Sequence, residues 1–224
     1  MIDELLPGTV SAVEAFTDPP GAFLFPEEEA VVRNAVDKRR REFTTARVCA
    51  RAALAKLGYP AAPILPGPRG APGWPAGVVG SMTHTAGYRA AAVARADEMH
   101  TIGIDAEVHD RLPDGVLGAV ADTIEQEALS RLPAGVHWDR LLFSAKESVY
   151  KAWFPLAGRW LDFSEARVTV RLDGTFAARL LVPGPTVAGT ELTGFDGRWL
   201  VRDGLALTVI TLPAAPPTPT SQRS

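Results

Sequence analysis

Apolar and polar positions in the first half of the chain predict a helix, a long loop and a small antiparallel sheet. Residues 43–57 carry an apolar stripe at helical spacing, and Pro26 followed by three glutamates is a typical helix start. A helical region is therefore predicted over residues 26–57. A loop rich in Pro and Gly follows at residues 60–76. The strands predicted after this loop lie at residues 78–83, 89–94 and 101–108.

The second half repeats this order of elements with different residues. Helices are predicted over residues 123–132 and 138–154. Alternating residues then predict two hairpins, which turn at Asp173-Gly174 and at residues 202–204. We therefore predict an α+β fold built as a pseudo-twofold pair of α+β subdomains, each a small antiparallel sheet with packed helices. The predicted divisions are residues 1–108, residues 109–212, and a disordered Pro/Thr/Ser tail at 213–224.

Acidic and basic residues stand at regular positions in one predicted strand and one predicted helix. Strand alternation puts Asp105 and Glu107 on one side of the sheet. Helical spacing puts Glu147 and Lys151 on one face of the helix at 138–154, with Lys146 beside them. If the two elements meet between the subdomains, three carboxylates and two lysines share a pocket. That group suits a hard divalent cation that holds a phosphate.

Each of these residues also has an ordinary structural interpretation. The two strand acids can be solvent-facing side chains, and Glu147 with Lys151 can be a simple helix ion pair. A lone histidine such as His84 is more often a structural hydrogen-bond partner than a catalyst. The arginines of the helix at 26–57 can form a solvated face or an anion site.

Composition narrows the class of protein. The chain has 224 residues, 46% of them apolar, and a formal net charge of −3, which gives no basic field for nucleic acid. Cys49 is the single cysteine, so an internal disulfide and a thiolate zinc cluster are excluded, and a reducing cytoplasm is expected. No signal peptide and no long apolar run is visible, so we expect no membrane association. Nucleophile-elbow, P-loop and H-E-x-x-H motifs are absent from the sequence.

Two short motifs, taken in order, resemble a known family. Gly103-Ile104-Asp105-Ala106-Glu107 and the later stretch from Phe143 to Lys151 resemble the two signatures of the 4′-phosphopantetheinyl transferase superfamily. Further upstream stretches resemble the branch that serves siderophore synthetases of the enterobactin type: residues 39–43, 47–50, 74–77 and 80–84. The resemblance covers roughly residues 20 to 155. Phe143 stands where many relatives have Trp, and Ala106 replaces a common Ile or Val, which leaves every charged group in place.

The resemblance implies a monomer of two similar halves with coenzyme A bound in the cleft between them. It implies transfer of the phosphopantetheine arm of coenzyme A to a serine of a carrier protein, with release of adenosine 3′,5′-bisphosphate. In this reading Asp105, Glu107 and Glu147 bind Mg²⁺ (Mn²⁺ is an alternative), and Lys151 lies near the reacting phosphate. The residues that would contact the coenzyme A phosphates and nucleotide are Thr83, His84, Arg40, Arg47 and Arg69.

The chemistry of the motifs agrees with these implied roles. Attack on a pyrophosphate needs its negative charge to be neutralised on both sides of the transferred phosphorus. Lys151 and Lys146 are the cations expected to stabilise the departing bisphosphate. Glu147 is our candidate base for the serine proton.

Two other functions stay open from the residues alone. One is a magnesium-dependent hydrolase of nucleotide pyrophosphates, which would use the same carboxylates with water as the nucleophile. The other is a non-catalytic subunit that docks coenzyme A and a carrier domain. The pathway served, whether siderophore, nonribosomal peptide or polyketide synthesis, is not legible in the sequence.

Overall fold

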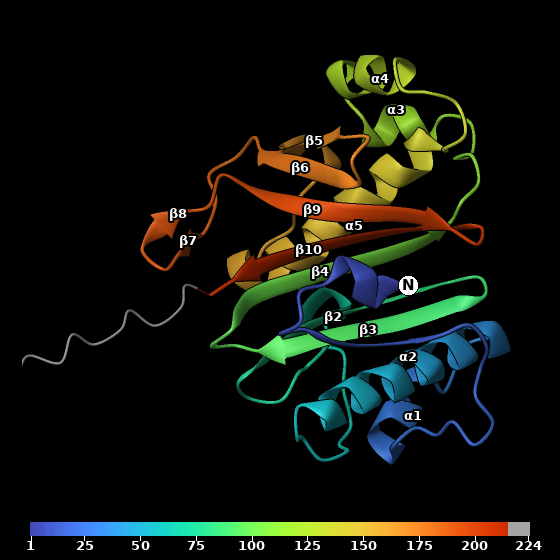
Figure 1. Cartoon of the computed structure of the whole chain (residues 1–224). Helices are drawn as coiled ribbons and strands as arrows, with labels where there is room; N and C mark the ends of the chain where they lie inside the picture. Colours follow the sequence, from blue (N-terminus) through green and yellow to red (C-terminus); the bar gives the residue numbers. More distant parts are fainter. Residues whose placement is uncertain (215–224) are drawn as a thin grey trace, which may run out of the picture.

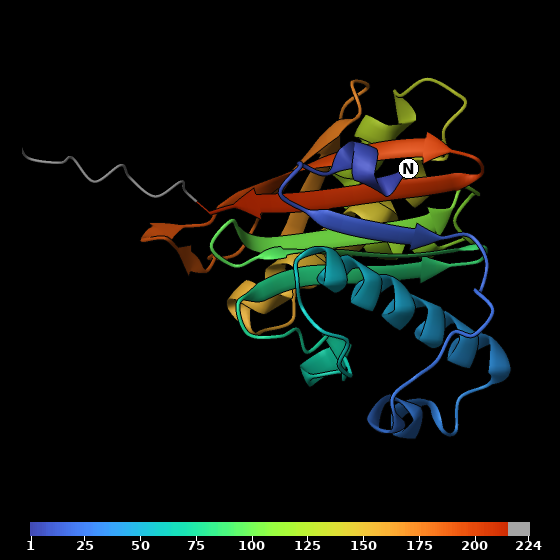
Figure 2. The same ribbon diagram turned by 60° about the horizontal axis from the view of Figure 1, so that its bottom comes forward.

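The computed structural model describes residues 1–214, which form two large antiparallel sheets with their helices and a small two-stranded sheet, β7-β8 (Figure 1). The sheet of the N-terminal half has the strand order β1-β3-β2, and helix α2 packs on it (Figure 2). The elements of this half are η1 (Ile2–Leu5), β1 (Ser11–Ala15), α1 (Pro26–Val32), α2 (Asp37–Lys56), η2 (Pro68–Gly70), β2 (Val78–Thr85) and β3 (Tyr88–Arg95).

The second sheet has five strands in the order β4-β10-β9-β6-β5, and the long helix α5 packs against its inner face. The α+β fold class with two similar halves is confirmed. The remaining elements are β4 (Met99–Val108), α3 (Val116–Val120), α4 (Thr123–Ser130), α5 (Trp138–Ala157), η3 (Phe163–Glu165), β5 (Ala166–Val170), β6 (Thr175–Leu180), β7 (Thr186–Val187), β8 (Thr190–Glu191), β9 (Gly194–Arg202) and β10 (Leu205–Pro213).

Most predicted elements are present, with two differences in the first half. The helix predicted over residues 26–57 is two helices, because the chain leaves helical geometry after α1 and Val36 is extended before α2 begins. Strand β1 was not predicted. Both predicted hairpins of the second half are confirmed, as β5 pairs with β6 and β9 pairs with β10.

Strand β4 joins a different sheet from the one that we expected. We expected this strand to complete the N-terminal sheet, but its backbone pairs with β10, with Asp105 opposite Thr208 and Glu107 opposite Ala206. β4 therefore belongs to the C-terminal sheet. Alternation along a strand shows which side chains share a face, and it carries no information about which distant strand will be the partner.

The two sheets meet where β2 lies beside β4, a line that we call the seam (Figure 1). Side chains, rather than a backbone ladder, join the strands there. The backbone N–H of Ile104 donates to Ser81 Oγ at 3.1 Å, and that of Ala106 donates to Thr83 Oγ1 at 3.0 Å. The two hydroxyls thus satisfy β4 amides that would otherwise be buried without a partner.

Helix α5 touches β4 at a glycine. A Cβ atom placed on Gly103 would lie 2.0 Å from the carbonyl oxygen of Ser148, so only glycine allows this approach. One turn further along α5, the carbonyl oxygen of Ala152 accepts a hydrogen bond of 2.8 Å from Thr101 Oγ1 of β4. This contact brings the α5 face that carries Glu147 and Lys151 against Asp105.

The end of the described chain overlaps the predicted tail by two residues. Pro213 ends β10, and the amide of Ala214 donates to the carbonyl oxygen of Glu98 at 2.9 Å. The rest of the predicted tail, residues 215–224, lies outside the described residues. Among the helices of residues 1–214, none has both the length and the apolar character needed to cross a membrane.

Candidate active site at the seam

Asp105 and Lys151 form the centre of the site. Lys151 Nζ donates to Asp105 Oδ1 at 2.7 Å and to the carbonyl oxygen of Ile104 at 3.0 Å. The hydroxyl of Thr83 donates to the same Asp105 oxygen at 3.3 Å. Asp105 is 5% exposed, and its other oxygen, Oδ2, is buried with no hydrogen-bond partner among residues 1–214. A buried carboxylate oxygen without a donor is costly, and a bound cation would remove that cost.

Glu107 lies two residues along β4 on the same side as Asp105. Its Oε2 accepts a hydrogen bond of 3.1 Å from the Arg140 guanidinium, which also holds the carbonyl oxygens of Asp110 and Arg111. Burial, and after it the charge of Asp105, raise the pKa of Glu107, while Arg140 and Lys151 act in the opposite direction. Glu107 is therefore anchored to α5 and lies within electrostatic reach of Asp105.

Glu147 faces the same group from α5. Burial, and after it the charge of Asp105, raise the pKa of Glu147, while Lys151 lowers it. Two glutamates thus have raised pKa values, and the same aspartate contributes to both. Carboxylates crowded in this way favour either a proton or a cation among them.

The carboxylates are electrostatic neighbours rather than an assembled metal cluster. Within the described residues, no three His, Cys, Asp or Glu side chains are grouped so that they could hold a metal ion. The reason is visible in the contacts, because Lys151 takes one oxygen of Asp105 and Arg140 takes one oxygen of Glu107. The donor set itself, three acidic side chains with a partnerless Asp105 Oδ2, fits a hard divalent cation.

The predicted pair Thr83 and His84 divides between two roles. Thr83 is buried, and its hydroxyl is used by Asp105 and by the Ala106 amide, so it supports the aspartate instead of facing a ligand. His84 is exposed enough to contact a ligand. Arg39 is hydrogen-bonded to its ring, and Glu42 Oε2 lies 3.6 Å from its Nδ1. Burial, and after it the charge of Arg39, lower the pKa of His84.

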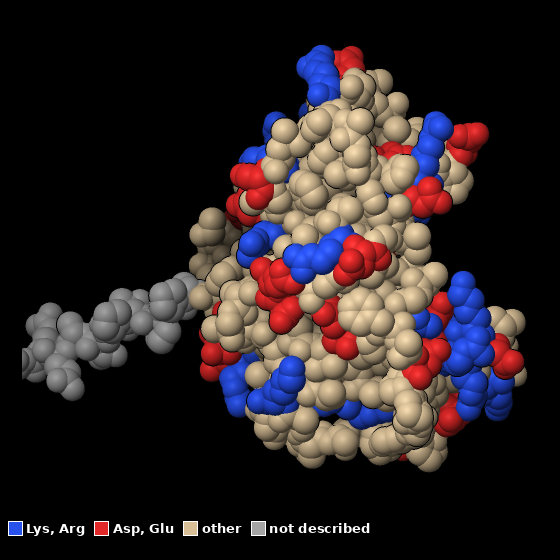
Figure 3. Space-filling view, turned by 45° about the vertical axis from the view of Figure 1, so that its right-hand side comes forward, with Lys and Arg blue, Asp and Glu red and all other residues tan. Residues whose placement is uncertain are grey.

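The three predicted arginines have different surroundings. Arg47 is buried, its guanidinium lies 3.5 Å from the centre of the Phe43 ring, and burial lowers its pKa to about 10. No carboxylate of residues 1–214 forms an ion pair with it, which suits an external anion. Arg40 is paired with Glu29. Arg69 has a left-handed backbone, with φ 53°, and its guanidinium carbon lies 5.4 Å from the centre of the Trp160 ring in the C-terminal half. Figure 3 shows basic side chains gathered on part of the lower, N-terminal half.

The surroundings of Lys146 differ from those that we expected. We expected it to contact the departing bisphosphate, but it is 3% exposed and its ammonium group donates three hydrogen bonds within the protein. An ammonium group has only three donors. Lys146 therefore has no hydrogen left for a ligand, although its side chain is among those that line the neighbouring cavity.

A narrow cavity of about 70 Å³ lies beside Glu147. Its walls come from α5 and from the chain between Trp160 and Ala166, and they are largely apolar. The hydroxyl of Tyr150 is buried without a hydrogen-bond partner in the described chain, and the Tyr150 ring contacts the Trp160 ring at this place, with 4.7 Å between ring centres and a tilt of 53°. The cavity is too small for a nucleotide, and its volume admits only a short part of a slender chain.

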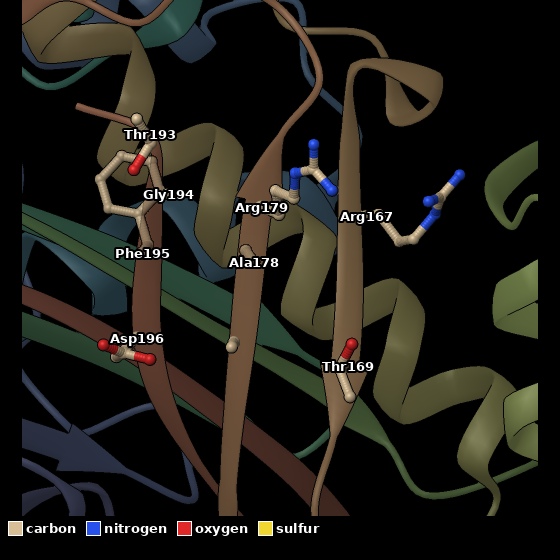
Figure 4. Close-up of a pocket in the computed structure, with 9 residues that line it drawn as sticks. Arg167, Thr169, Ala178, Arg179, Thr193, Gly194, Phe195 and Asp196 are labelled. Atoms are coloured by element: carbon tan, nitrogen blue, oxygen red, sulfur yellow. The ribbon is translucent and has the colours of Figure 1, made fainter. Parts of the chain in front are cut away.

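A wider hollow lies on the outer face of β5, β6 and β9, where the sheet turns away from α5 (Figure 4). Its volume is about 500 Å³, and Arg167, Arg179 and Asp196 project into it from three neighbouring strands. The hollow contains none of the predicted site residues. The size of a hollow therefore does not identify the reactive site, and the seam remains the candidate.

Sequence reasoning missed Arg140 and Glu125. Arg140, Glu147 and Lys151 stand at intervals of seven and four residues on α5, so helical spacing places Arg140 on the site face. Glu125 follows Asp122 by three residues in a capping box at the start of α4. That pattern marks a helix start, and it gives no sign that Glu125 also binds Lys146.

Comparison with known proteins identifies the family of the chain. The family model described as "4'-phosphopantetheinyl transferase N-terminal domain" matches residues 27–94, and "4'-phosphopantetheinyl transferase superfamily" matches residues 101–208. The chain is 58% identical over 221 residues to 4'-phosphopantetheinyl transferase Svp of Streptomyces mobaraensis, which covers 96% of this chain and 90% of the relative. It is 50% identical over 222 residues to PptT of Mycobacterium tuberculosis, covering 95% and 98%.

The expected enterobactin-type branch is matched less strongly. Enterobactin synthase component D of Salmonella typhimurium is 32% identical over 187 residues, which is 80% of this chain and 75% of the relative. The chain is therefore more similar to the Svp and PptT proteins than to that branch.

Proposed function

The chain belongs to the 4′-phosphopantetheinyl transferase superfamily, and we propose that it transfers the arm of coenzyme A to a serine hydroxyl of apo carrier proteins, with Mg²⁺, releasing adenosine 3′,5′-bisphosphate. The observation that carries the proposal is the seam itself. Asp105, with a partnerless buried oxygen, lies between Lys151 and two carboxylates of raised pKa.

Coenzyme A is the substrate of this family, and its members typically need a divalent metal. We assign Asp105, Glu107 and Glu147 as the residues that would hold it. When bound, the cation neutralises diphosphate charge. Mg²⁺ is favoured because the donors are all carboxylate oxygens, and Mn²⁺ accepts the same donors.

The side chains supply the proton transfer and the charge balance of the reaction. The serine oxygen bonds to the phosphorus next to the pantetheine arm, and the bond from that phosphorus to the bridging diphosphate oxygen breaks. Glu147 takes the serine proton, and its raised pKa brings it closer to neutral pH, where a base is most effective. Lys151 stabilises the negative charge that develops on the departing bisphosphate.

The nucleotide end is assigned to basic side chains of the N-terminal half. Arg47 supports this assignment best, because it is a buried cation without a carboxylate partner in the described chain. His84, Arg40 and Arg69 are the further contacts that we propose. Thr83 acts through Asp105. The slender arm is assigned to the narrow cavity between Tyr150 and Phe163, next to Glu147.

Carrier proteins of siderophore, nonribosomal peptide or polyketide synthesis are the proposed acceptors. One relative is named a component of enterobactin synthase, which favours the siderophore assignment among them. We propose a cytoplasmic monomer, since the single cysteine, Cys49, is a free buried thiol that suits a reducing compartment.

The test is incubation with coenzyme A, Mg²⁺ and a panel of apo-carriers, read by intact-protein mass. A mass increase equal to one phosphopantetheine group on the carrier supports the proposal. Consumption of coenzyme A without a carrier would favour the pyrophosphate hydrolase instead. Binding of both partners with no mass increase would favour a docking subunit.

A further inference from the structure

A buried ion pair lies directly behind the proposed site. Lys146 Nζ is 2.8 Å from Glu125 Oε2, and the two side chains are 3% and 1% exposed. No role in the transfer chemistry accounts for this pair. Ion pairs buried to this degree are costly to desolvate and are weak devices for stability alone, so their position in the fold needs an explanation.

The pair lies beside the apolar cluster in which α5 packs against Ala121, Leu161 and Val168, and it adds polar bonds between these same four segments. Lys146, on α5, also donates to the carbonyl oxygens of Val120 at 2.7 Å and Phe163 at 2.9 Å. Glu125, on α4, accepts from the backbone amides of Val168 at 2.7 Å and Asp122 at 2.9 Å. Two side chains thus tie the α3–α4 segment, the 161–166 segment and strand β5 to α5.

The tied segment is a wall of the narrow cavity. Leu161, Asp162, Phe163 and Ala166 line it opposite α5, and Glu147 follows Lys146 directly in the helix. The segment from Trp160 to Phe163 contains no strand or long helix, and it is held by the buried side chain of Leu161 and by the contacts that its backbone makes. Among the Lys146 contacts, the bond to the Phe163 carbonyl fixes the wall at its centre.

We propose that Lys146 and Glu125 are positioning residues that fix the 161–166 wall and thereby set how tightly the arm of coenzyme A is held beside Glu147. The inference rests on the proposed function, because it takes the cavity as the place of the arm. Neither charged group is available to the substrate, since every Lys146 donor is used within the protein and Glu125 is 2% exposed. Their effect is expected on the arm and not on the nucleotide end.

The experiment separates these two ends of the ligand. Coenzyme A carries the arm, whereas adenosine 3′,5′-bisphosphate lacks it, so calorimetric titration of both ligands isolates the contribution of the wall. The variants are Glu125→Gln and the double variant Lys146→Leu with Glu125→Leu, which removes both charges together. Tyr88→Phe is the matched control, because it removes one hydrogen bond, to Glu14, in an apolar cluster that contains none of the cavity residues.

We expect both variants to weaken coenzyme A binding about tenfold, equal to about 1.4 kcal/mol, and to leave bisphosphate binding within about twofold. Tyr88→Phe should change the affinity for neither ligand. Equal weakening of both ligands, or no weakening of either, would overturn the positioning role. Failure of the wild type to bind coenzyme A or modify a carrier would instead reject the proposed function, so the two failures are distinguishable.

Discussion

The hydroxyl of Thr83 donates to Asp105 Oδ1 at 3.3 Å while it accepts from the Ala106 amide at 3.0 Å. One small side chain on β2 therefore joins the two sheets and orients the central carboxylate of the site. The relationship explains why a buried threonine stands at this position. It also leads to the first of five predictions.

Replacing Thr83 should affect both stability and activity. Thr83→Val removes the donor to Asp105 and leaves the buried Ala106 amide without an acceptor, so we expect a loss of about 1–3 kcal/mol of unfolding free energy. The transfer rate should fall as well. Thr83→Ser keeps the hydroxyl and is the control. Urea unfolding and carrier modification measure the two effects, and a fully active, fully stable valine variant would contradict the proposed orientation of Asp105.

Removing a site carboxylate should stop the chemistry without unfolding the protein. Asp105→Ala and Glu147→Ala should each lower the transfer rate by about a hundredfold or more, the range of lost acid–base or electrostatic assistance. Circular dichroism should show the folded state in both. Retained full turnover by either variant, with Mg²⁺ present, would refute the assignment of that residue. Arg202→Gln, at a surface ion pair with Glu4, is the control.

The raised pKa of Glu147 predicts two pH effects of opposite sign. As a base, Glu147 must be ionised, so activity should fall as the pH decreases through its raised pKa, which lies above the ordinary 4.5. The unfolding free energy changes with pH in the opposite direction. The folded state binds the proton more readily than the unfolded state, so this group lowers the unfolding free energy as the pH rises through the same window.

Glu147→Gln tests the stability effect. The variant should be more stable than the wild type at pH 7, and the difference should shrink as the pH falls below 4.5, where glutamate becomes protonated in both the folded and the unfolded state. Urea titrations at several pH values in metal-free buffer measure it. A constant difference across this range would show that burial does not raise the pKa.

Divalent metal should stabilise the protein through Asp105. A cation that binds only the folded state raises the unfolding free energy by mass action, by about 2.7 kcal/mol at a hundredfold excess over its Kd. The melting temperature of the wild type should rise with Mg²⁺ and return with a chelator, and carrier modification should stop in the chelated protein. Asp105→Ala should lose the thermal shift. An equal shift in the wild type and the variant would place the metal elsewhere.

The approach of α5 to β4 should tolerate no side chain at Gly103. Gly103→Ala places a Cβ 2.0 Å from the Ser148 carbonyl oxygen, so α5 must move, at a cost of about 1–3 kcal/mol and with Lys151 displaced from Asp105. The control is Gly118→Ala in α3, where nothing lies within 4 Å of the added atom. Urea unfolding and carrier modification should separate the two variants, and an active, stable Gly103→Ala protein would contradict the described packing.

The residues of the site and the faces that carry them were predictable from the sequence. Alternation in β4 and the four-residue spacing in α5 report which side chains share a face, because both periods follow from backbone geometry alone. Asp105, Glu107, Glu147 and Lys151 were found in this way. The family resemblance rests on the same short motifs, and their order along the chain carried it.

Tertiary structure alone decided how those faces meet and which charges are already used. β4 pairs with β10, Thr83 supports Asp105, and Lys146 donates to Val120, Glu125 and Phe163 behind the site. None of these follows from spacing, because each joins residues far apart in the chain. The sequence determines which groups can do the chemistry, whereas long-range packing and burial determine which of them remain free to do it.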